Sequence, residues 1–266
     1  MDLPCQDNSQ GTAAETLGLT RRGHLTGLFS AFCTVMLAQH VSACAPARRM
    51  AARDWIDRQS ELARALKTGG IRPVQWMDEV ARLAHEIDVA ALMHDVRQAR
   101  LVDAGAPPTN DPHKHSVQFL DDAGQRRQLG YAAALFNFAP HNVITPHGHR
   151  NMVSAHLVVE GRLRIRNFDR LRDEKDGIVI RPTRDEVASV GTLSAMSSDR
   201  DNIHWFVPQA GPAATFDVII SGIDPDQPDY DITAIDPVGG RMLPDGSLLA
   251  PRMEFEHASA KYTASI

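Results

Sequence analysis

Cysteine is confined to the start of this sequence. The three cysteines are Cys5, Cys33 and Cys44, and every later position is free of cysteine. This distribution excludes a cysteine nucleophile, a cysteine-bound zinc site and a disulfide bond from the main body of the chain. Its stability must therefore come from a packed core, and 266 residues with 43% hydrophobic content are enough to build one.

An excess of positive charge is also missing. Lysine and arginine together number 28 against 33 aspartates and glutamates, which gives a formal net charge of -5. Proteins that bind nucleic acid usually carry a basic face, so nucleic acid is not an expected partner. Small molecules or other proteins are the partners that this composition leaves.

A hydrophobic run long enough to span a membrane is absent as well. The apolar stretch at residues 25–41 is interrupted by Gln39 and His40 and is shorter than the roughly 20 residues that a spanning helix needs. It follows Arg21-Arg22 in a segment that resembles a twin-arginine export signature. We predict that residues 1–46 are an export signal of a bacterial protein, which then works in the periplasm or anchored to the membrane.

The end of this segment, residues 41–44, reads Val-Ser-Ala-Cys and resembles a bacterial lipobox. The resemblance implies that Cys44 is lipidated and forms a membrane anchor. One alternative is simple cleavage near Ala43-Cys44-Ala45 without a lipid. The other is an N-terminal helix in a cytoplasmic protein.

Residues 47–112 are predicted to be a helical lead-in followed by a linker. Apolar residues at helical spacing predict one helix from Arg48 to about Gly69, a second after Pro73, and a third from Asp88 to about Leu101. Glycine and prolines at residues 105–112 predict the linker. How this region relates to the rest of the chain is open, and packing against it as a lid or support is our hypothesis.

Residues 113–223 are predicted to form a closed β-barrel or sandwich, because short β-rich runs alternate with turn residues. The fold class is therefore mainly β, with a short helical region before it. Hairpin turns are predicted at residues 121–124 and at Glu160-Gly161. The tail, residues 224–266, is rich in Pro, Asp and Gly, and we predict irregular structure that packs on the barrel with one or two extra strands. The β-rich runs are Ser116–Leu120, Gln128–Phe138, Met152–Val159, Arg162–Phe168, Ile178–Pro182 and Thr215–Ser221.

Three histidines in the β-rich region are candidate metal ligands. His147 and His149 are two residues apart, and in a strand such residues point to the same face. His204 lies on a later apolar run that can cross beside them. Neutral imidazoles are common ligands of divalent transition metals, so these residues predict one metal ion inside the barrel.

These motifs resemble the cupin superfamily and, within it, the cysteine-dioxygenase-like thiol dioxygenases. The matching features are the Pro-His-x-His turn at residues 146–149, the turn glycine Gly161 that ends the strand at residues 157–161, and the later His204. The resemblance covers about residues 116–221. It implies an RmlC-like jelly roll that holds Fe²⁺ and that oxidises a small anionic thiol or related acid with O2.

The sequence departs from this family at two points. Ser154 stands where many cupins carry a glutamate ligand, which leaves three histidines without a carboxylate. The Ser-His-Tyr trio of the thiol dioxygenases is replaced by Thr215, Asp217 and Ile219. Three neutral ligands leave the full charge on a divalent ion, which favours anionic substrates.

Other cupin chemistries therefore stay open. The alternatives are an isomerase or hydrolase that uses another divalent metal, and a non-enzymatic periplasmic protein that binds a metal or small ligand. Barrels of this kind often pair through exposed strands, so a homo-oligomer is left open too. The sequence identifies neither a catalytic nor a substrate-binding residue.

Three further residues are expected near the metal. His156 shares strand parity with Ser154, so both are expected to face the cavity. His156 is a candidate to support the ligands or to act as an occasional fourth ligand, against the alternative of a core histidine bonded to its neighbours. Asp217 is expected to orient the imidazole of a metal ligand.

Two other patterns are interpreted as solvated surface. Arg162, Arg164 and Arg166 alternate with Leu163 and Ile165, which is typical of a strand whose outer face meets water, although an arginine could also anchor a substrate carboxylate. The sequence His-Lys-His at residues 113–115 repeats the His-x-His pattern without a matching turn glycine. We interpret it as a solvated strand entrance.

Overall fold

The fold is described from a computed structural model, which covers residues 49–107, 110–228 and 231–263. The predicted export signal and the lipidation candidate Cys44 lie outside these residues and stay predictions. Within the described ranges, no helix combines the length and the apolar character needed to cross a membrane.

Three amphipathic helices open the described chain, as predicted. They are α1 (Ala52–Lys67), α2 (Pro73–Glu86) and α3 (Val89–Gln98). Pro73 is at the start of α2 and the Asp88 side chain caps α3, and both are favoured at a helix N-terminus. The Trp55 indole of α1 donates a hydrogen bond of 3.1 Å to the Leu83 carbonyl of α2. The third helix was predicted too long, because residues 100–103 form a strand instead.

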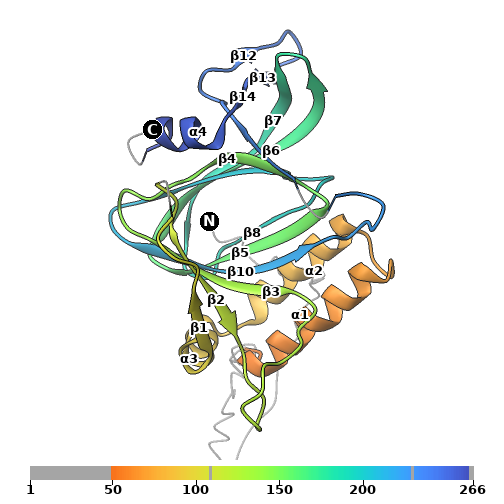
Figure 1. Ribbon diagram of the computed structural model, residues 1–266, viewed down its shortest axis with the longest axis vertical. Helices are drawn as coiled ribbons and strands as arrows, with labels where there is room; N and C mark the ends of the chain where they lie inside the picture. The colour runs from red at the N-terminus through yellow and green to blue at the C-terminus, as the bar shows by residue number, and fades with distance from the viewer. Residues whose placement is uncertain (1–48, 108–109, 229–230, 264–266) are drawn as a thin grey trace, which may run out of the picture. The chain divides into compact units, whose positions relative to one another are not determined.

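In the described part of the chain, fourteen strands follow, arranged in two sheets (Figure 1). The smaller sheet has the order β1-β2-β3-β10-β5-β8, and the larger has the order β12-β13-β7-β6-β9-β4-β11-β14. All of the pairings between neighbouring strands are antiparallel. The strands are β1 (Arg100–Asp103), β2 (His113–Gln118), β3 (Ala132–Phe138), β4 (Ile144–Arg150), β5 (Met152–Glu160), β6 (Arg162–Glu174), β7 (Gly177–Ser189), β8 (Leu193–Met196), β9 (Ile203–Pro208), β10 (Ala213–Ser221), β11 (Asp231–Ile235), β12 (Arg241–Met242), β13 (Leu248–Ala250) and β14 (Arg252–Met253).

The middle strands follow jelly-roll topology. Strands β3, β10, β5 and β8 lie side by side in one sheet, while β7, β6, β9 and β4 lie side by side in the other. The chain therefore crosses between the sheets after β3, β4, β5, β7, β8, β9 and β10, and the two curled sheets face each other (Figure 1). This order confirms the predicted cupin-type barrel. The predicted hairpin at Glu160-Gly161 is wrong, because β5 and β6 belong to different sheets and the glycine forms the corner between them.

Strand β5 is buried on both faces, which explains the position of the helices. Val153, Ala155 and Leu157 point outward and share one apolar core with the helices, whereas Ser154 and His156 point into the barrel. The helices therefore cover the outer face of the smaller sheet (Figure 1). Each large apolar side chain buried there stabilises the fold by about 1.5–3 kcal/mol.

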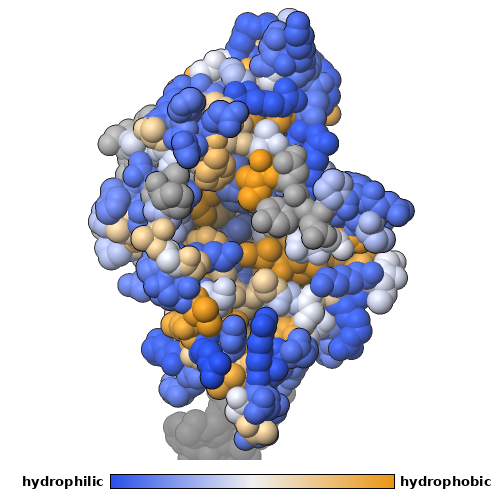
Figure 2. Space-filling model, viewed as in Figure 1, coloured by the Kyte–Doolittle hydropathy of each residue, from blue (hydrophilic) through white to orange (hydrophobic). Residues whose placement is uncertain are grey.

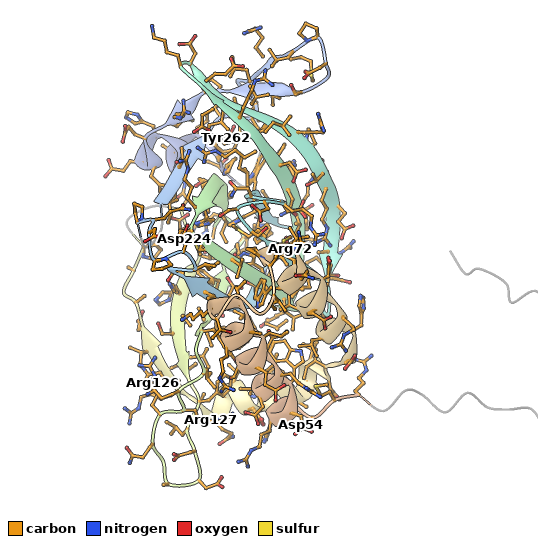
Figure 3. All side chains as sticks on the ribbon, turned by 90° about the vertical axis from the view of Figure 1, so that its right-hand side faces the viewer. Asp54, Arg72, Arg126, Arg127, Asp224 and Tyr262 are labelled. Atoms are coloured by element: carbon orange, nitrogen blue, oxygen red, sulfur yellow. The ribbon has the colours of Figure 1, made fainter. Side chains whose placement is uncertain are left out.

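The C-terminal tail is more regular than predicted. Strand β11 pairs with β4 and strand β13 pairs with β7, so the tail extends the larger sheet at both edges. A short helix, α4 (Phe255–Lys261), follows. Its C-cap residue Tyr262 packs edge-on against Trp205 at a centroid distance of 5.0 Å and donates a hydrogen bond of 2.6 Å to Asp236. Figure 3 shows Tyr262 toward the opposite end of the view from Asp54 of α1.

Candidate metal centre

A bulge in strand β4 aims its histidines into the barrel. Ile144 pairs with Phe206 and His147 pairs with His204, so three steps along β4 match two steps along β9. The extra residue lets Ile144 and His147 face the interior together. His149 follows His147 by the two-residue period of a strand and faces the same cavity.

The three predicted ligands meet at one point inside the barrel. The ring centroids lie 4.6 Å apart for His147 and His149, 4.4 Å for His147 and His204, and 5.2 Å for His149 and His204. All three residues are buried. The structure thus brings together residues from two distant parts of the sequence that the sequence analysis had paired.

The glycine between the first two histidines is required by close packing. A Cβ atom on Gly148 would lie 2.7 Å from the side-chain oxygen of Asn202, which is too short for a non-bonded contact. The Asn202 amide donates a hydrogen bond of 2.6 Å to the carbonyl of His149. Asn202 therefore fixes the backbone that carries the ligands, and only glycine leaves room for it.

Burial keeps the three imidazoles neutral. It lowers the pKa of His147 to about 4 and lowers the pKa values of His149 and His204 well below the ordinary range, with a smaller contribution from neighbouring imidazoles. The Thr145 carbonyl accepts a hydrogen bond of 2.7 Å from His147 Nδ1. This bond assigns the proton to Nδ1 and leaves the Nε2 lone pair free to bind a cation.

The geometry fits a metal ion. One nitrogen from each ring can be chosen so that all three lie within 4.8 Å of one another, and a tetrahedral ion with bonds of about 2.0–2.1 Å holds its ligand atoms roughly 3.3–3.4 Å apart. Shifts of less than about 1 Å suffice. The buried Nδ1 atoms of His149 and His204 find no hydrogen-bond partner among the described residues, which is unusual for buried polar atoms.

A buried chain of hydrogen bonds lies beside the three histidines. His156 Nδ1 donates to Asp217 Oδ2 at 2.7 Å, and the Ser154 hydroxyl donates to His156 Nε2 at 2.9 Å. The His156 ring centroid is 5.0 Å from that of His204. Asp217 had been expected to orient the imidazole of a metal ligand, but it orients His156, which is not one of the three candidate ligands. Both nitrogens of His156 are engaged, which argues against a fourth-ligand role.

The histidines line a cavity of about 480 Å³ at the open end of the barrel. Apolar side chains surround this opening, and Figure 2 shows the surface hollowed there. Phe206 lies deeper, with its ring centroid 5.1 Å from that of His204. The lining includes two residues that sequence reasoning missed, Lys114 of β2 and Phe255 of α4.

The basic side chains of Lys114, Arg164 and Arg166 lie either in the cavity or on the outer face of β6. Among the described residues that line the cavity, Lys114 carries the one lysine or arginine charge. Arg164 forms a two-bond ion pair with the exposed Asp185, and the Arg166 guanidinium stacks on Trp205 at 3.7 Å. These arginines lie on the outer face of β6, as the alternating pattern had indicated, but the expected solvation is wrong for Arg166, which is only 9% exposed. The position of Lys114 could have been inferred from the two-residue period of β2. Lys114 lies between His113 and His115, so it points to the opposite face of the strand.

Comparison with known proteins does not assign a family to this chain. No protein-family model and no curated protein matches the sequence. Among solved structures, KdgF from Halomonas sp. is similar with a TM-score of 0.31 and 15% identity, over 46% of this chain and 86% of that chain. A double-stranded β-helix protein from Klebsiella pneumoniae is similar with a TM-score of 0.31 and 12% identity, over 48% and 83%.

A hydroquinone 1,2-dioxygenase solved with Cd²⁺ and 4-hydroxybenzonitrile is also similar, with a TM-score of 0.28 and 15% identity, over 36% of this chain and 61% of that chain. These overlaps are low. The fold assignment therefore depends on the strand order, and the chemistry depends on the residues of the cavity.

Proposed function

We propose that this protein is a metal-dependent oxygenase in which His147, His149 and His204 hold one ferrous ion. The substrate is a small anionic thiol or a related acid. One observation carries the proposal: three buried neutral imidazoles converge in the cavity, and no carboxylate belongs to this group of candidate ligands. Ferrous iron held by three neutral ligands would supply an uncompensated positive charge and open positions for an anionic substrate and dioxygen.

The cavity supports recognition of a small anion. Its volume of about 480 Å³ is at the small end of the range for small-molecule sites. The Lys114 ammonium lies 5.6 Å from the ring of Phe136, which also lines the cavity. In the proposal, Lys114 pairs with a carboxylate on a substrate whose other end reaches the histidines.

The chain of Ser154, His156 and Asp217 supports handling of a proton. Asp217 holds the imidazole of His156 in one orientation, and the opposite ring nitrogen faces the Ser154 hydroxyl. A thiol that binds as a thiolate must release a proton, and a histidine oriented by a carboxylate is a suitable acceptor. In the proposal, Ser154 relays this proton to His156.

The same chain supports a second candidate function. A serine, a histidine and an aspartate in hydrogen-bonded order are also suited to hydrolysis, in which His156 would take a proton from water or from Ser154. This candidate uses another divalent metal, such as zinc, and needs no dioxygen. Partners under both candidates are small molecules, and export from the cytoplasm stays a prediction based on residues 1–46.

Oxygen uptake separates these candidates. The full-length protein is reconstituted with Fe²⁺ without air, and dioxygen consumption is then followed with 3-mercaptopropionate, which carries a carboxylate, and with neutral 2-mercaptoethanol. We expect uptake with the anionic thiol that depends on iron and disappears in a His204→Ala variant. Iron-loaded protein that consumes no dioxygen with any anionic thiol would contradict the oxygenase proposal. Ester hydrolysis by the zinc-loaded protein would then favour the second candidate.

A further inference from the structure

A second cluster of metal-ligating side chains lies outside the barrel, where β1 pairs with β2. Asp103 is directly opposite His115 in the antiparallel register. His113 shares a face of β2 with His115, and their ring centroids are 4.6 Å apart. One ligand atom from each of these three side chains lies within 4.8 Å of the other two. The cluster therefore matches the barrel histidines in compactness.

The cluster is open to solvent and partly ordered by its neighbours. The side chains of His113 and Asp103 are 40% and 59% exposed. Asp103 Oδ1 accepts a hydrogen bond of 2.6 Å from His113 Nε2 and one of 2.8 Å from the Gly105 amide. The other carboxylate oxygen, Oδ2, offers a further ligand atom to a cation. An ion can therefore reach the cluster without opening the core.

Asn137 supports one ring of the cluster. Its side-chain amide is 3.2 Å from His115 Nδ1. Because the amide can be turned to present its oxygen, Asn137 Oδ1 can accept a hydrogen bond from His115 Nδ1–H, which leaves Nε2 free. A hydrogen bond of this kind on the far nitrogen is typical of metal-bound histidine.

We propose that Asp103, His113 and His115 form a second divalent metal site, which suits zinc best. Two imidazoles and one carboxylate are a usual zinc ligand set, whereas calcium and magnesium prefer oxygen ligands. A tetrahedral zinc ion with bonds of about 2.0–2.2 Å holds its ligand atoms roughly 3.3 Å apart. Asp103 Oδ1 and His113 Nε2, which are hydrogen-bonded at 2.6 Å, must therefore move apart by less than about 1 Å. An exposed carboxylate achieves this by rotation.

An ion at this site ties together two strands that form part of the cavity rim. Residues 104–107 directly follow Asp103 and line the cavity, and so does Lys114, which lies between the two histidines on the opposite face of β2. Zinc would therefore fix the rim and hold the Lys114 side chain toward the cavity. The site uses none of the barrel histidines, so it stands or falls separately from the proposed oxygenase activity.

Zinc stoichiometry tests the site. The untagged full-length protein, with its three cysteines alkylated, is dialysed to equilibrium against Zn²⁺, and bound zinc is measured by elemental analysis. His113→Ala and His115→Ala remove ligands at the surface, and His85→Ala on the exposed side of α2 is the matched control. We expect about two equivalents of zinc per chain for the wild type and the control, and about one for each ligand variant.

A His147→Ala variant separates the two sites, because its effect on zinc content reports only on the barrel. If the wild type holds one equivalent that is lost in His113→Ala and retained in His147→Ala, the surface site is supported and the barrel site is contradicted. Unchanged zinc content in both His113→Ala and His115→Ala overturns the proposal, whatever the wild-type stoichiometry.

Discussion

Replacing His156 by leucine should leave the buried carboxylate of Asp217 without a hydrogen-bond partner. Asp217 is 0% exposed, accepts a hydrogen bond of 2.7 Å from His156 through Oδ2, and has no partner for Oδ1 among the described residues. Leucine keeps much of the volume, and thus keeps water away, but it donates no hydrogen bond. Removing the hydrogen-bond partner of a buried charge leaves that charge uncompensated, which costs about 3–5 kcal/mol. We expect the free energy of unfolding of His156→Leu to fall by about this amount.

Urea unfolding of the metal-free protein, followed by tryptophan fluorescence, measures this loss. A double variant, His156→Leu with Asp217→Leu, tests the cause because it removes the stranded carboxylate, and it should regain at least half of the lost stability. Ser154→Ala is the matched control. It leaves the His156–Asp217 pair intact and should cost about 1 kcal/mol. A loss below about 1 kcal/mol for His156→Leu, or additive losses in the double variant, would refute the reasoning.

Three further predictions concern the corner glycine, the cavity lysine and pH. Gly161→Ala should destabilise the fold by several kcal/mol in thermal unfolding, because Gly161 has φ +67° and an added Cβ would lie 2.3 Å from the Pro212 carbonyl oxygen. The control is Gly191→Ala. Gly191 has φ +91° and no atom within 4 Å of an added Cβ, so this variant should cost only about 1 kcal/mol. Equal losses would contradict this. Lys114→Met should raise the KM for an anionic thiol about tenfold, or about 1.4 kcal/mol, and leave that for a neutral thiol unchanged. Burial lowers the pKa of His147 to about 4, against about 6.5 in the unfolded chain, so the unfolded chain binds more protons between these values. The contribution of His147 to the free energy of unfolding of the metal-free protein should therefore be complete above about pH 6.5, and about 3 kcal/mol should be lost as the pH falls toward 4. Urea unfolding that is independent of pH would contradict this prediction.

The convergence of the three candidate metal ligands could be predicted because ligand chemistry and strand period act locally. The two-residue spacing of His147 and His149 fixes their common face, and few residue types other than histidine suit a neutral transition-metal site. The barrel was predictable for a similar reason, since turn residues separate the strands in the sequence. The exact faces of β5 and β6 followed from alternation of polar and apolar residues.

Features that depend on pairing between distant segments could not be predicted. Residues 100–103 continue a helical pattern, and their strand conformation comes from pairing with β2. The partner of Asp217 depends on the register between β10 and β5, which places it opposite His156 and which sequence alone does not fix. Phe255 lines the cavity only because the tail folds back along β4 through β11.

Iron content of two matched variants tests the central claim most directly. The protein carrying His113→Ala, which disables the surface cluster, and the same protein with His147→Ala added are both alkylated at cysteine and dialysed against Fe²⁺ without air. We expect about one equivalent of iron per chain in the first protein and almost none in the second, because two imidazoles bind ferrous iron far more weakly than three. Equal iron content in the two proteins would show that His147 does not hold the ion.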